Sequence, residues 1–184
     1  MTEKLYEETK ERMIKSVSHY QSEVSTIRTG RASATLLDAI QVEFYGTSNP
    51  LKNIALVSTP DPHMITIQPY DPNALEEIEK AIINSDVDLT PNNDGTLIRL
   101  SIPPLTEERR KELVKLVHKI IEEGRISIRN IRRDSNDKLK GLEKENSISE
   151  DALKIELENI QDLTNEHIEM LNTIQDNKEK EILD

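Results

Sequence analysis

Residues 106–145 read TEERRKELVKLVHKIIEEGRISIRNIRRDSNDKLKGLEKE, a stretch without proline in which apolar or small residues recur every three or four positions. This spacing is typical of one buried stripe on a long amphipathic helix. A helix of about forty residues is about 60 Å long, at 1.5 Å per residue. The stretch therefore predicts one long rod, buried along Leu113, Val117, Ile120, Gly124, Ile128, Ile131, Ser135, Leu139 and Leu142.

Two other segments repeat this spacing and predict two further long helices. The first runs from about Leu5 to Arg28, and Gly30 follows at a position where helices commonly end. The second begins after the cap Ser149, with Ile148 and Leu153 packed around the cap as a hydrophobic staple. The predicted stripes are Met13, Val17, Tyr20, Val24 and Ile27 in the first, and Leu153, Leu157, Ile160, Thr164, His167, Leu171 and Ile174 in the second. Three such helices can bury their stripes together.

Residues 31–104 have a different pattern, with shorter elements and all eight prolines of the chain, five of them between 50 and 72. Alternating apolar residues predict a half-buried strand wherever they are followed by turn residues. Strands are expected at 40–44, 51–57 and 64–68, and a hairpin from 87–89 to 96–102 that turns at Asp94-Gly95. Between them, Asp71-Pro72 predicts the start of a helix that ends near Asn84, with Tyr70 and Leu75 as its staple.

The predicted fold class is therefore α+β with two domains, an elongated three-helix bundle and a small inserted β/α/β domain. The bundle is expected from 1–30 and 105–184, and the inserted domain from 31–104. The chain would cross between them twice, at Gly30-Arg31 and at Pro103-Pro104. Two short crossings are the usual anatomy of a hinge that permits rigid-body rotation.

Composition excludes several classes of protein. The chain has no Cys, which excludes disulfides, thiolate metal sites and a cysteine nucleophile. It has no apolar stretch of about 18 residues that could span a bilayer, and no signal peptide at its N-terminus. With 3% aromatic residues, RNA recognition by base stacking is not expected. We therefore expect a soluble protein, and a reducing, cytoplasmic location is consistent with this composition. The predicted oligomeric state is a monomer.

No catalytic or metal site is predicted. His118 has an acidic neighbour at Glu122, a pattern that favours a surface ion pair, and His167 is interpreted as a histidine at the boundary of the core. Asn92, Asp94 and Gly95 are similar to the start of a calcium loop, but the hairpin explains them better, because the twelfth position would be Ser101 instead of Glu. An enzyme and a cofactor are therefore not expected.

The charges are distributed unevenly along the chain. Its net charge is -11, yet residues 109–140 contain eleven Lys and Arg against five Asp and Glu, a local charge of +6 that leaves -17 elsewhere. Arg125, Arg129 and Arg132 lie at helical spacing, with Arg133 beside them. Guanidinium forks match phosphate, so this stripe predicts an edge that binds structured RNA through its backbone. Two alternatives remain open: a solvated helix face paired by Asp134 and Asp137, and an acidic scaffold that binds proteins.

Several motifs, in this order along the chain, resemble the ribosome recycling factor family. They are RTGR at 28–31, IPPLTEERRK at 102–111 and IRNIRRDSND at 128–137, with FYG at 44–46, IQP at 67–69, IEKAI at 78–82 and ISED at 148–151. The resemblance covers essentially the whole chain. Departures are Ala34, Asn49-Pro50 and Ser135, where the family often has Pro, Thr-Pro and Ala.

The resemblance implies a factor that, with elongation factor G and GTP, splits ribosomes after termination and has no catalytic residues of its own. It implies two partners, the ribosomal RNA of the large subunit and elongation factor G, and assigns RNA binding to the arginine-rich helix of the bundle. The RNA-binding residues it indicates are Arg129, Arg132 and Arg133, then Arg125 and Asn130, then Arg28, Arg31, Arg109 and Arg110; the hinge residues are Gly30, Arg31, Pro103 and Pro104.

Overall fold

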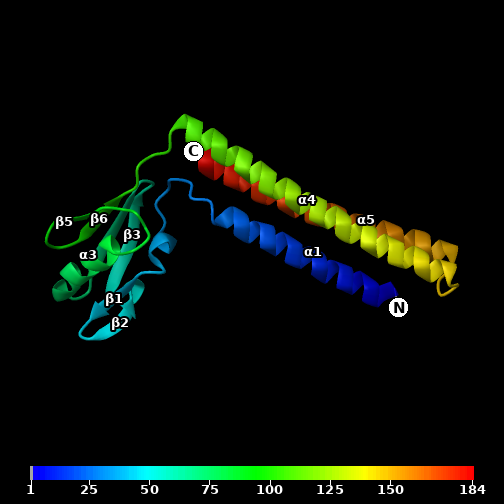
Figure 1. Cartoon of the computed structure of the whole chain (residues 1–184), viewed down its shortest axis with the longest axis horizontal. Coiled ribbons are helices and arrows are strands. Elements are labelled where there is room, and N and C mark those ends of the chain that lie inside the picture. Colours follow the sequence, from blue (N-terminus) through cyan, green and yellow to red (C-terminus); the bar gives the residue numbers. More distant parts are fainter. Residues whose placement is uncertain (1) are drawn as a thin grey trace. The chain divides into compact units, whose positions relative to one another are not determined.

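The chain forms two structural units in the computed structural model, which describes residues 2–184 (Figure 1). One unit contains residues 2–29 and Glu107–Asp184, and the other contains Gly30–Thr106. The first is entirely helical and the second contains all the strands of the described residues. The predicted fold class, a three-helix bundle with a small inserted α+β unit, is confirmed.

The bundle consists of α1 (Thr2–Ser25), α4 (Glu107–Lys144) and α5 (Glu150–Leu183), which run side by side (Figure 1). The rod predicted from residues 106–145 is thus present as 38 helical residues. The cap of α5 is also confirmed, because the Ser149 hydroxyl accepts a hydrogen bond from the Ala152 amide. Ile148 and Leu153 pack against the same small cluster around Leu139 and Ile160.

The predicted end of α1 is wrong, because this helix ends at Ser25 and not near Arg28. The hydroxyl groups of Ser25 and Thr26 donate hydrogen bonds to the carbonyl oxygens of Ser22 and Glu23. Serine and threonine side chains that bond nearby carbonyls compete with the helical ladder. The last turn therefore unwinds before it reaches Gly30, which nevertheless has the left-handed φ of 72° that its position suggested.

The buried stripe of α4 differs from the prediction at two positions. Ile121 is fully buried, whereas the predicted Ile120 and Leu142 are only half-buried. A helix that packs against two neighbours buries a face wider than one seam, and the stripe then follows the 3.6-residue period. On α5, His167 is 2% exposed, so it belongs to the core and not to its boundary. Its Nδ1 donates to the Leu163 carbonyl oxygen at 2.7 Å.

Polar contacts fix how α1 lies against α4. The hydroxyl groups of Thr9 and Ser135 lie 2.7 Å apart, and both side chains are 1% exposed. Ser16 donates to Ser127 at 2.9 Å further along the same pair of helices. Buried hydroxyl groups are tolerated only when they are paired, so these contacts select one register of the two helices. Ser135, a departure from the family pattern, therefore has a partner on α1.

The two glycines of α4 differ in their surroundings. A Cβ built on Gly124 would lie 3.1 Å from the Tyr20 ring of α1 and 3.2 Å from Leu171 of α5. Gly124 thus lies where the three helices pack closely together, and only a residue without a side chain fits without displacement. A Cβ on Gly141 would meet no atom within 4 Å.

Replacing Gly141 with alanine should raise the free energy of unfolding by about 0.5 to 1 kcal/mol, because glycine in a helix is that much less favourable than alanine. Urea denaturation followed by circular dichroism measures this difference. Gly124→Ala in the same helix is the matched control, since its new methyl group would crowd Tyr20. A Gly141→Ala variant no more stable than the wild type would contradict this account of the α4 glycines.

The inserted unit consists of two sheets and one main helix. The hairpin of β1 (Gln41–Phe44) and β2 (Thr47–Pro50) stands beside a four-stranded antiparallel sheet in the order β3-β4-β6-β5. The other bounds are β3 Ala55–Asp61, β4 Met64–Pro69, α3 Leu75–Ile83, β5 Pro91–Asn93 and β6 Ile98–Ser101, with short turns η1 Ala34–Leu37, α2 Leu51–Ile54 and η2 Pro72–Ala74. Its core is separate from that of the bundle and contains residues of both sheets and α3.

Three predictions within this unit are wrong. Residues 51–54 form a helical turn, because Leu51 and Ile54 are apolar at a helical spacing of three, and the strand begins only at Ala55. Residues 87–89 form no strand, because Asp88 has a φ of 55°, and the hairpin instead pairs Pro91–Asn93 with Ile98–Ser101. Tyr70 is 67% exposed, so it forms no staple with Leu75.

Candidate nucleic-acid interface

The arginine stripe of α4 lies on the flank of the helix that borders α5. Arg125 is its most enclosed member, with a side chain 20% exposed. Its Nε and Nη2 donate to Asn172 Oδ1 at 3.1 and 2.7 Å, and Nη2 also donates to Gln175 Oε1 at 3.1 Å. Its Nη1 donates to Glu122 Oε2 at 3.0 Å. Arg125 is therefore anchored between α4 and α5.

The other arginines of this stripe are progressively more open. Arg132 donates to Gln161 Oε1 of α5 at 2.9 Å and is half-buried. Arg129 is 43% exposed and donates to Glu122 Oε1 at 3.3 Å. Arg133 is exposed and makes no hydrogen bond or ion pair with any of residues 2–184. The structure thus brings Arg125, Arg129, Arg132 and Arg133 onto one flank, with the exposed Asn130 on the same helix.

Glu122 is the one carboxylate that these four arginines contact among the described residues. The hydrogen bond from Arg125 lowers the pKa of Glu122; partial desolvation opposes this shift, and Arg129 adds to it. Glu122 is therefore ionised at neutral pH and offsets part of the positive charge of its two neighbours. The predicted pair of His118 with Glu122 is wrong, because His118 pairs with Glu179 of α5.

The remaining predicted RNA-binding residues lie away from this flank. Arg110 donates to the Leu183 carbonyl oxygen at 2.6 Å, and Arg109 pairs with Glu112 at 2.8 Å. These contacts place both at the end of the bundle where α4 begins, about 24 Å along the helix from Arg125. Arg28 is exposed and lies three residues after the end of α1. The residue that follows it, Thr29, donates a hydrogen bond to Glu181 of α5, near the same end of the bundle. Arg31 belongs to the other unit.

Three side chains of α5 that the sequence analysis did not select hold these arginines. Gln161, Asn172 and Gln175 accept the hydrogen bonds from Arg132 and Arg125. A signal was present, because 161, 165, 168, 172, 175 and 179 follow the four-and-three spacing of a second stripe beside the apolar one. Four of these six positions are amides in a helix that is otherwise rich in carboxylates. An unusual residue type at a regular spacing was therefore visible in the sequence.

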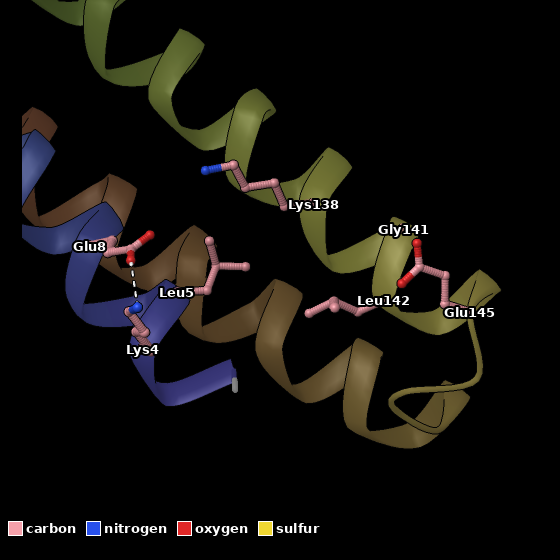
Figure 2. Close-up of a pocket in the computed structure, with 7 residues that line it drawn as sticks. All are labelled: Lys4, Leu5, Glu8, Lys138, Gly141, Leu142 and Glu145. Atoms are coloured by element: carbon pink, nitrogen blue, oxygen red, sulfur yellow. Dashed lines mark ion pairs between the residues drawn. The ribbon is translucent and has the colours of Figure 1, made fainter.

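The other features of the bundle provide weaker candidates for a functional site. A cleft with a volume of about 310 Å³ lies between the start of α1 and the end of α4 (Figure 2). Lys4 and Lys138 are balanced there by Glu8 and Glu145, around Leu5 and Leu142. Within residues 2–184, no group of three or more His, Asp or Glu could hold a metal ion. The helices of this same range include none long and apolar enough to cross a membrane.

The chain matches known proteins over its full length. The family model described as ribosome recycling factor matches residues 20–183. Ribosome-recycling factors of Bacillus licheniformis and Bacillus subtilis are 50% and 47% identical over 184 residues, which is 100% of each chain. These matches therefore span both structural units.

Solved structures agree with these relatives. A solution structure of the ribosome recycling factor has a TM-score of 0.76 at 43% identity, covering 99% of this chain and 97% of the other. A second structure holds models for the T. thermophilus ribosome recycling factor and the E. coli elongation factor G bound to the E. coli post-termination complex. It has a TM-score of 0.65 at 47% identity and covers 100% of both chains. The chain therefore belongs to the ribosome recycling factor family.

Proposed function

We propose that this chain, acting with elongation factor G and GTP, splits post-termination ribosomes into subunits and releases them from mRNA. The observation that carries this proposal is the full-length match to ribosome-recycling factors, at 50% identity over 184 residues. The choice of partners is supported by the structure that holds models for a ribosome recycling factor and elongation factor G bound to a post-termination complex. GTP hydrolysis belongs to elongation factor G, and this chain acts as a cytoplasmic monomer without a cofactor.

The bundle, 1–30 and 105–184, is the part that binds ribosomal RNA of the large subunit. Arg129, Arg132 and Arg133 present planar forks of donors that fit phosphate oxygens, and they are held on a helix that is rigid over 38 residues. Such contacts read the backbone and shape of folded RNA, which suits a chain with few aromatic residues. Arg28, Arg109 and Arg110 form a second basic group at the end of the bundle, and Arg31 follows in the linker.

The two crossings, Gly30-Arg31 and Pro103-Pro104, act as a hinge for the inserted domain, 31–104. Gly30 has a φ of 72°, a conformation that favours glycine. A Cβ at Gly30 would lie 2.8 Å from Leu105 Cγ, so the two crossings run against each other at this point. The motion proposed at these two short linkers is a rotation of the whole inserted domain, which is the usual motion about a hinge.

Replacing Gly30 with alanine should slow ribosome splitting several-fold while changing large-subunit affinity less than twofold. The new methyl group would be strained at this φ and would displace Leu105. Gly46→Ala is the matched control, since Gly46 has a φ of 73° and no atom within 4 Å of its Cβ. Splitting by Gly30→Ala at the rate of Gly46→Ala would remove the hinge role from this contact.

The proposed function is tested by incubating post-termination ribosomes with this chain, elongation factor G and GTP, then sedimenting them through a sucrose gradient. Free subunits are expected only when all three are present. Ribosomes that remain intact with the complete mixture, under conditions where the Bacillus subtilis relative splits them, would refute the proposal.

A further inference from the structure

The stripe of amides on α5 lies along the arginine flank and supplies most of its hydrogen-bond acceptors. Asn172 accepts two hydrogen bonds from Arg125, Gln175 accepts a third, and Gln161 accepts one from Arg132. Gln161 is itself oriented by its Nε2, which donates to Asn165 Oδ1 at 2.9 Å. Asn172 likewise donates to Glu169 Oε2 at 3.1 Å. The orientations of Gln161 and Asn172 therefore do not depend on the arginines alone.

Neutral acceptors are unexpected in this helix. α5 contains ten Asp and Glu residues, and a carboxylate is the ordinary partner for a guanidinium group. A carboxylate at 161, 172 or 175 would hold the arginine in the same place and cancel its charge. An amide oxygen accepts the same hydrogen bond and leaves the charge of the guanidinium group intact.

Each guanidinium group has five N–H donors, so one partner leaves several donors available. Arg132 donates one hydrogen bond within residues 2–184, to Gln161. Its side chain is therefore oriented while most of its donors can still reach a phosphate. A long side chain loses rotamer freedom when it binds, and one that is already held loses less. Orientation by a neutral partner thus favours binding in two ways.

We propose that Gln161 is a positioning residue, which holds Arg132 on the flank of the bundle and keeps its charge for RNA phosphate. Asn172 and Gln175 anchor Arg125 beside it, and Arg125 already donates four hydrogen bonds within the chain, one of them to Glu122. This inference rests on the proposed function, since it assumes that the bundle binds ribosomal RNA. It assigns to α5 a part in binding that the arginine motif of α4 does not contain.

The test converts the amide of Gln161 to a carboxylate of the same shape in the full-length chain. Gln161→Glu should weaken binding to isolated large ribosomal subunits about tenfold, as expected when one charge-assisted phosphate contact is lost. It should also reduce the log-log salt slope by nearly one. The thermal midpoint should stay equal or rise, because a new ion pair with Arg132 replaces a neutral hydrogen bond. A structural role alone would lower stability and leave the salt slope unchanged.

Asn177→Asp is the matched control, because Asn177 is exposed on the same helix and makes no hydrogen bond or ion pair with residues 2–184. It adds the same charge and should change affinity less than twofold. The opposite exchange is Glu122→Gln, which removes the carboxylate that contacts Arg125 and Arg129 and should tighten binding two- to fivefold. Glu123→Gln, at the exposed neighbouring position, is its control and should have little effect.

The possible results distinguish a failure of this inference from a failure of the proposed function. If Gln161→Glu weakens binding no more than Asn177→Asp, the positioning role is overturned even when the wild type binds normally. If Gln161→Glu fails to fold, Gln161→Ala decides the matter: weaker binding with an unchanged thermal midpoint supports the role, and unchanged affinity overturns it. A wild type that does not bind large subunits would instead overturn the proposed function.

Discussion

Replacing Gly124 with leucine should lower the free energy of unfolding of the bundle by about 3 kcal/mol, the upper range for overpacking a core. A Cβ alone would already approach Tyr20 to 3.1 Å and Leu171 to 3.2 Å. The leucine side chain adds three more carbons between α1, α4 and α5, and none of the three helices can withdraw without exposing its buried stripe. Urea denaturation followed by far-ultraviolet circular dichroism measures the loss.

Gly141→Leu is the control for this change, because it places the same side chain on the same helix in open space. It should alter the free energy of unfolding by less than about 1 kcal/mol, the scale of a change in helix propensity. Equal losses for the two leucine variants would mean that Gly124 does not set the distance between the helices.

The second large effect is expected on RNA binding. The double variant Arg129→Glu and Arg133→Glu should weaken binding to large ribosomal subunits at least about a hundredfold, since each lost charge-assisted contact contributes about 1.5 to 3 kcal/mol. Both side chains are open, and the one partner they have among the described residues is Glu122, so the fold should be unaffected. Equilibrium binding at fixed salt measures the effect, and circular dichroism verifies that the helices remain.

A matched variant reverses two exposed lysines outside the arginine flank, Lys4 on α1 and Lys154 on α5, whose side chains are 84% and 64% exposed. Lys4→Glu with Lys154→Glu changes the net charge by the same amount. Affinity should then fall less than tenfold, because long-range repulsion is screened by salt. If both double variants weaken binding equally, the net charge of the chain governs binding and the flank has no special part in it.

The helices of the bundle could be predicted accurately because long periodic segments have few alternative structures. Proline-free spacing over residues 106–145 yielded a helix that the structure places at Glu107–Lys144. The end of α1 could not be found in the same way, since it depends on the hydroxyl bonds of Ser25 and Thr26. The burial of Ile121 in place of Ile120 depends on where α1 and α5 lie against α4. The spacing of residues within one helix does not contain this information.

Short elements of the inserted unit were harder, because four-residue patterns fit several structures. Leu51 and Ile54 suit a helical turn as well as a strand, and only the buried position of Leu51 decides between them. Asp88 has a left-handed φ of 55°. Aspartate tolerates this conformation, but an aspartate in a sequence does not by itself predict it. Local sequence therefore predicted that strands were present, but not where each begins.

The positions of the arginines in the candidate site could be predicted from the sequence, but their hydrogen-bond partners could not. Helical spacing placed Arg125, Arg129 and Arg132 on one flank of α4, where the structure has them. Which of them is anchored and which is open depends on α5, a helix distant in sequence. Arg125 is enclosed because Asn172 and Gln175 lie opposite it, and that pairing requires the register of the two helices. Only the structure supplies this register.

The central claim is that a row of guanidinium groups on α4 binds RNA phosphate although the chain has a net charge of -11. The most direct test measures the dissociation constant of the wild-type chain for large ribosomal subunits from about 0.1 to 0.4 M monovalent salt. About four phosphate contacts predict a log-log slope of the association constant of roughly -3, at about 0.7 to 0.9 per contact. A slope near zero, or affinity that rises with salt, would contradict the claim.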